Sequence, residues 1–119
     1  MGDRRMAEIK LRDGSLYVYT HSGGNALPDV AKAAILAAKP RWGDEPYVTR
    51  ILVDQLTKAG RDRETGYGLM LRASAEDFYN DDSPSVIIDL ATQVLTIIDL
   101  HSATRLTTTF RDLWDAVKV

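Results

Sequence analysis

The stretch Tyr17-Val-Tyr-Thr-His-Ser-Gly-Gly-Asn-Ala-Leu-Pro28 joins a strand pattern to a helix pattern. Its first four residues favour a β-strand, because aromatic and β-branched side chains pack well on a pleated surface. Gly23 and Gly24 then allow a sharp change of direction, since glycine adopts positive φ without steric cost. A run with helical spacing begins at Leu27. The stretch therefore predicts a strand, a turn and a helix, with His21 at the end of the strand.

A β-hairpin is predicted just before this stretch. Residues 7–12 alternate apolar and charged side chains, which is the period-two pattern of a half-buried strand. Residues 16–20 alternate in the same way, and Asp13-Gly14 lies between the two runs. Asp-Gly is a strong hairpin signal, because the favoured tight turn needs positive φ at both central residues.

Two helices are predicted after the stretch. In residues 27–38, the residues that recur at helical spacing are Leu27, Val30, Ala34, Ala37 and Ala38, and Pro40 ends the run. Asp44 is a candidate N-cap for a second helix, and Gly60 supplies its C-terminal stop. The apolar stripe of this second helix consists of Val48, Ile51, Leu52, Gln55, Leu56 and Ala59.

The rest of the chain predicts three further strands and a last helix. Residues 66–72 place Tyr67, Leu69 and Leu71 on one face of a strand, and a polar loop follows over 73–85. Residues 86–90 and 94–98 resemble a second hairpin. Thr109 and Asp112 have the spacing of a capping box that opens a short C-terminal helix, and the preceding threonines indicate a cap and turn.

These elements predict an α+β fold in the order ββααβββα. We expect one domain over residues 1–119, because 119 residues with 45% hydrophobic content suffice for a single core. The sheet should be mainly antiparallel with five strands, two helices on one face and the short C-terminal helix at an edge.

The composition argues against several classes of protein. The absence of cysteine excludes disulfides, thiolate zinc sites and a cysteine nucleophile, and two histidines are a poor inventory for a metal, so no metal or cofactor is expected. No apolar run approaches the roughly 20 residues that span a bilayer, and no signal peptide is evident, so a cytoplasmic protein is expected. A net charge of −2 argues against direct binding of nucleic acid.

The first candidate site is an anion pocket at the start of the first helix. His21, Gly23 and Gly24 would supply an imidazole and backbone amides, and Arg41 or Arg50 would close the pocket if the loops converge. Such a pocket predicts a small-molecule or nucleotide/phosphate-binding protein, or a hydrolase. The alternative is that His21 bonds a backbone carbonyl and the glycines only turn the chain. No Walker loop or dinucleotide fingerprint is present.

The second candidate site is an acidic segment with two aromatic residues. Four carboxylates flank an aromatic pair, and the six residues are Glu76, Asp77, Phe78, Tyr79, Asp81 and Asp82. Exposed aromatic side chains among acidic groups are typical of a surface that contacts a protein partner. The alternative is a solvated loop. The spacing does not fit a calcium-binding EF-hand loop.

Several short motifs together resemble a family of small uncharacterised proteins from phages, prophages and actinobacterial genomes. The shared stretches are residues 17–24, Leu27-Pro28, Arg41-Trp42-Gly-Asp44, Tyr47, Arg50-Ile51, Thr65-Gly-Tyr-Gly68 and residues 86–90. Many of the relatives carry tryptophan where this chain has Ser22. The resemblance implies a phage-like context in a bacterial host cell and brings no established reaction.

These observations lead to three expectations about function. The first is a small accessory protein that acts non-enzymatically by binding another protein, as an inhibitor of host machinery or defence in the manner of an anti-CRISPR protein. The second is the ligand-binding protein or hydrolase with a pocket at His21. The third is a structural homo-oligomer, because exposed hairpin edges favour symmetric pairing. No catalytic residue is assigned.

Overall fold

The computed structural model describes residues 5–20, 26–60, 62–72, 84–99 and 104–117. The helices and strands follow one another as β1 (Arg5–Leu11), β2 (Gly14–Thr20), α1 (Leu27–Ala37), the 3₁₀ helix η2 (Lys39–Arg41), α2 (Glu45–Thr57), β3 (Tyr67–Arg72), β4 (Val86–Asp89), β5 (Val94–Asp99), β6 (Thr104–Thr109) and α3 (Phe110–Val117). The α+β class is therefore confirmed.

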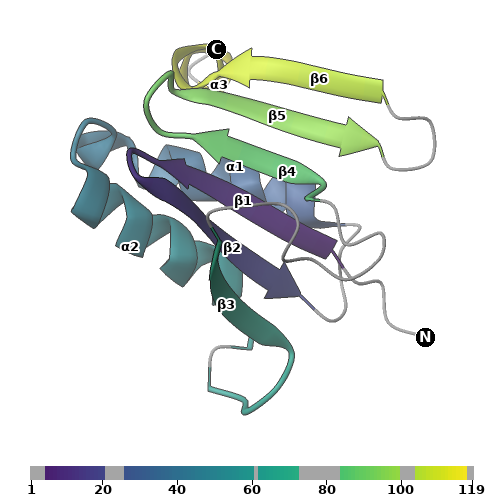
Figure 1. Cartoon of the computed structure of the whole chain (residues 1–119). Helices are drawn as coiled ribbons and strands as arrows, with labels where there is room; N and C mark the ends of the chain where they lie inside the picture. The colour runs from purple at the N-terminus through teal and green to yellow at the C-terminus, as the bar shows by residue number, and fades with distance from the viewer. Residues whose placement is uncertain (1–4, 21–25, 61, 73–83, 100–103, 118–119) are drawn as a thin grey trace.

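One six-stranded sheet runs through the described part of the chain, in the order β3-β2-β1-β4-β5-β6 (Figure 1). The central pair, β1 and β4, is parallel, and the other four pairings are antiparallel. The prediction of five strands was wrong, because the threonine-rich residues 104–109 form a sixth strand, β6, whose last residue also caps α3. This segment lacks apolar alternation, and its strand conformation depends on backbone pairing with β5.

The β1–β2 hairpin forms as predicted, but its turn is Arg12-Asp13 rather than Asp13-Gly14, because Gly14 is the first residue of β2 and pairs with Leu11. Gly14 has φ of 154°, a value that favours glycine, and the strands pair from Leu11 opposite Gly14 to Arg5 opposite Thr20. Ser15 Oγ donates a hydrogen bond to Glu8 Oε2 at 2.6 Å on the face of the sheet away from the helices. The hairpin thereby fixes the register of β1 against β2.

Helices α1 and α2 cover one face of the sheet, as predicted (Figure 1). The small side chains of the buried alanines on α1 allow the two helices and the sheet to approach closely. Ala37 was expected to lie on the same apolar stripe, but it is exposed. The core is made of apolar side chains from both layers, including Ala7, Ile9, Val18, Leu27, Ala31, Ala34, Ile35, Val48, Leu52, Leu56, Val86, Ile88 and Leu95. Burial of these side chains supplies the main driving force for folding.

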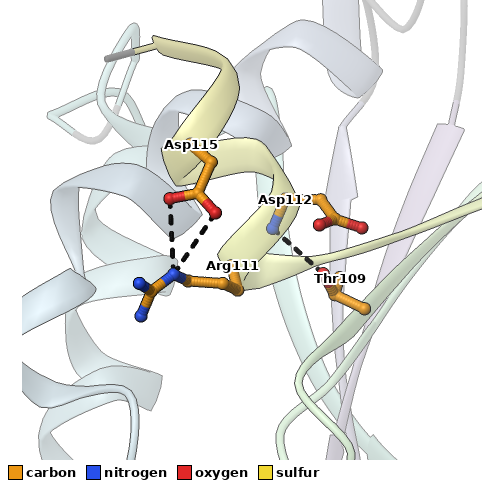
Figure 2. Close-up of polar contacts among 4 residues, drawn as sticks. All are labelled: Thr109, Arg111, Asp112 and Asp115. Atoms are coloured by element: carbon orange, nitrogen blue, oxygen red, sulfur yellow. Dashed lines mark hydrogen bonds and ion pairs between the residues drawn. The ribbon is translucent and has the colours of Figure 1, made fainter.

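Helix α3 begins with the predicted cap. The backbone N–H of Asp112 donates to Thr109 Oγ1 at 3.0 Å, and Arg111 Nε lies 3.3 Å from Asp115 one turn further along (Figure 2). Phe110 is fully buried, and its ring lies 5.3 Å from the ring of Trp42. The first turn of α3 therefore closes one end of the core.

Candidate functional site

A pocket of about 320 Å³ lies between the end of β2, the start of α1, the end of α2 and the start of β3. The residues that line it are mostly apolar and come from all four elements: Thr20, Leu27, Val30, Ala33, Gln55, Leu56, Lys58, Ala59 and Tyr67. Thr20 and Leu27, which lie on either side of the strand-to-helix connection, are therefore both part of the lining.

The pocket forms where the small side chains of Ala33 and Ala59 adjoin the large ring of Tyr67. Ala33 on α1 and Ala59 after α2 reach only a short way into the space between the helices. Tyr67 packs so closely on the C-terminal end of α2 that a Cβ added at Gly60 would lie 3.1 Å from Tyr67 Cε2. Helix α2 ends at Thr57, three residues before the predicted stop at Gly60, and the close contact at Gly60 leaves room for the Tyr67 ring beside the pocket.

The polar groups of the pocket are few. Thr20, Gln55 and the Tyr67 hydroxyl offer uncharged hydrogen-bonding groups, and Lys58 supplies the charge. No carboxylate is among the described lining residues, and no ion pair joins Lys58 to another described residue. The charge that the lining presents is therefore positive.

The predicted anion site lies only in part within the described residues. His21, Gly23 and Gly24 lie outside the described residues. Arg41 follows the far end of α1, where its guanidinium stacks over the Tyr47 ring at 5.0 Å and its Nη1 lies 3.9 Å from Asp44 Oδ2. Asp44 occupies the N-cap position of α2 without a side-chain capping bond.

Arg50 is exposed on the second turn of α2, whereas the pocket uses the last turn of that helix and the residues after it. Neither Arg41 nor Arg50 lines the pocket. The structure thus places a pocket beside the predicted strand end, and its described lining includes neither of the two predicted arginines. Sequence reasoning missed the residues that line the pocket, because α2 and β3 approach α1 only in the folded chain.

A second candidate surface is the outer edge of β3. This strand pairs with β2 over six consecutive residues and has no other strand beside it in the described sheet. Leu69 and Leu71 lie opposite Val18 and Leu16 on the helix-bearing face, yet they are 53% and 76% exposed. An open edge with exposed leucines is a ready surface for pairing with another chain.

The predicted acidic contact segment begins just after β3. All six of its residues, Glu76, Asp77, Phe78, Tyr79, Asp81 and Asp82, lie outside the described residues. The described strand ends at Arg72, one residue before the predicted loop, so the exposed leucines and the acidic segment are neighbours in sequence.

An aromatic cluster holds α3 against the helix connection. Trp42 donates from Nε1 to the Ile35 carbonyl at 2.8 Å. The Lys39 ammonium lies 4.8 Å from the Trp114 ring centroid and 5.7 Å from that of Trp42. A cation between two aromatic faces is stabilised by their quadrupoles, so this cluster is accounted for as a structural contact.

Among the described residues there is no group of three or more side chains that could hold a metal ion. Within the same ranges, no helix has the length and apolar character needed to cross a bilayer.

Comparison of the chain with protein-family models, curated proteins and solved structures found no match in any of the three. The resemblance to phage and actinobacterial proteins therefore stays a prediction from the motifs quoted above.

Proposed function

We propose that the protein acts by binding another protein along the outer edge of β3. The observation that supports this proposal is a strand edge with no other described strand beside it, combined with Leu69 and Leu71 exposed on one face. Natural sheets usually protect their edges with lysine, proline, bulges or covering segments. In β3 there is no lysine or proline, and its pairing with β2 is continuous.

A partner that contributes an extended segment would use the backbone of β3 for affinity and the leucines for specificity. Alternate N–H and C=O groups of an edge strand point away from its neighbour and are free to pair. Every second side chain of the added strand would lie on the helix-bearing face beside Leu69 and Leu71. Apolar residues at those positions would remove the leucines from water.

The acidic segment at residues 76–82 extends this proposed surface in sequence. We propose that its four carboxylates and two aromatic residues contact the same partner after the strand has docked. Inhibition of host machinery or defence is the use that we propose for such binding, and an acidic surface would suit a partner with a basic groove.

The experiment is affinity capture from an extract of the cells that naturally make the protein, with mass spectrometry as the readout. The Leu71→Lys variant tests the edge, and replacement of Glu76, Asp77, Asp81 and Asp82 by serine tests the acidic segment. The matched control is Leu106→Lys, because Leu106 is 65% exposed on β6, the opposite edge of the sheet. We expect one partner to be lost with Leu71→Lys and retained with Leu106→Lys; retention in both variants would contradict the proposal.

A second copy of this chain is the alternative partner, because the spacing of Leu69 and Leu71 on β3 suits a symmetric pairing of two such strands. If two β3 strands pair antiparallel with Leu69 opposite Leu71 of the other copy, all four leucines lie on one face, because the side-chain period is two. Sedimentation velocity distinguishes the cases. A dimer that Leu71→Lys dissociates would identify a structural homo-oligomer, whereas a monomer would leave the edge open for a different protein.

A further inference from the structure

We infer that the pocket between α1, α2 and β3 binds a small organic carboxylate with an apolar body of about ten carbon atoms. This inference goes beyond the proposed protein binding, because it concerns a different surface and a different class of ligand. It depends on three properties of the pocket, which are its volume, its lining and the charge of Lys58.

The volume sets the size of the ligand. An apolar cavity of about 150 Å³ accommodates one benzene molecule. The pocket, at about 320 Å³, has roughly twice that volume and therefore suits a chain of about ten carbons or two fused rings.

The lining determines the chemistry of the ligand's body. One wall of the pocket comes from α1 and consists of Leu27, Val30 and Ala33. The facing wall consists of Leu56 near the end of α2 and Ala59 just after it. Tyr67 of β3 adds a flat aromatic surface. Such a lining gains free energy by removing an apolar body from water and offers little to a polyhydroxylated or multiply charged molecule.

The charge determines the ligand's polar end. Lys58 is exposed beside the apolar walls, so its ammonium can meet an anionic group while the rest of the ligand is buried. Nucleotide and phosphate sites use several convergent donors or an arginine fork, and here the described lining contributes one ammonium. A monoanion such as a carboxylate fits this single charge better than a phosphate.

The test is a titration of the isotope-labelled protein with decanoate below its micellar concentration, followed by NMR. Decanol, 2-naphthoate and inorganic phosphate are the comparison probes. Ala33→Phe fills the pocket, and Ala37→Phe is its matched control, because Ala37 is exposed one turn along α1 and does not line the pocket. Lys58→Gln removes the charge, and Lys10→Gln on the exposed part of β1 is its control.

We expect decanoate to shift the amide signals of the lining residues, with an affinity that falls at least about tenfold in Ala33→Phe and is unchanged in Ala37→Phe. Lys58→Gln should weaken decanoate about threefold or more and leave decanol unaffected. Tighter binding of 2-naphthoate than of decanoate would identify the carboxylate as an aromatic one.

Three results would overturn the inference: no decanoate binding up to millimolar concentration, equal binding to Ala33→Phe and wild type, or equal effects of Lys58→Gln on decanoate and decanol. Phosphate binding at the same residues, stronger than decanoate binding, would also contradict it. Partner capture through β3 should be unchanged by Ala33→Phe, so failure of this inference and failure of the proposed function are separable.

Discussion

Leu71 of β3 lies directly opposite Leu16 of β2, but only Leu16 packs against the core. Leu71 is 76% exposed on the same face of the sheet. The helix layer therefore covers β2 at this position and leaves Leu71 of the edge strand uncovered. This difference between two paired leucines is the physical basis for assigning the edge of β3 to binding rather than to the core.

Replacement of Leu71 by lysine should change the free energy of unfolding by less than about 0.5 kcal/mol, because exposed side chains contribute little to stability. Leu52→Ala is the contrasting variant, since Leu52 is fully buried, and it should lose about 2–5 kcal/mol. Urea denaturation followed by circular dichroism measures both. A loss above about 1.5 kcal/mol in Leu71→Lys would show that Leu71 packs in the native core.

Replacement of Lys39 by methionine should lower the free energy of unfolding by about 1 kcal/mol, because it removes the cation between Trp42 and Trp114. Lys39→Arg should retain most of this stability, since arginine also stacks on aromatic rings. Thermal and urea unfolding give the difference, with Lys10→Met as the control on the sheet. Equal stability of Lys39→Met and wild type would exclude a contribution from the cluster.

Thr109→Ala should lower the free energy of unfolding by about 1 kcal/mol, because it removes the acceptor for the Asp112 N–H at the start of α3. Thr109→Ser keeps the hydroxyl and should preserve the cap. Thr107→Ala is the matched control, since Thr107 is exposed on the same strand. The account of the cap is wrong if Thr107→Ala and Thr109→Ala have the same effect on urea unfolding.

Gln93 is the non-glycine residue with positive φ, 56°, in the described chain, and it lies in the turn between β4 and β5. Gln93→Val should cost about 1–2 kcal/mol, because a β-branched side chain is strained in this conformation. Gln93→Asn should be tolerated, since asparagine adopts positive φ more readily. Differential scanning calorimetry of both variants checks the order, and a Val variant as stable as the Asn variant would contradict it.

Much of the fold was predictable because its signals are local. Asp13-Gly14 between two alternating runs predicted the first hairpin, and the stripe through Val48 and Leu52 predicted α2. β6 was missed because its residues have no apolar alternation and become a strand only by pairing with β5. The parallel pairing of β1 with β4 is likewise invisible locally, since the paired residues Ala7 and Val86 are far apart in sequence.

The candidate site was less predictable, because the residues that form it are far apart in sequence and meet only in the folded chain. A strand followed by glycines and a helix indicated one side of the pocket, but the facing side comes from Gln55, Leu56, Lys58, Ala59 and Tyr67. Arg41 was expected to close the pocket if the loops converge. Because an 11-residue helix is about 16 Å long, the far end of α1 carries Arg41 away from the pocket.

The most direct test of the proposed function is hydrogen–deuterium exchange of the free protein and of the complex recovered by affinity capture. Alternate amides of β3 point away from β2 and exchange readily in a free edge strand. The proposal predicts that residues 68–72 exchange more slowly in the complex while β6 is unchanged. Unchanged exchange in β3, with protection confined to other strands or helices, would contradict binding through this edge.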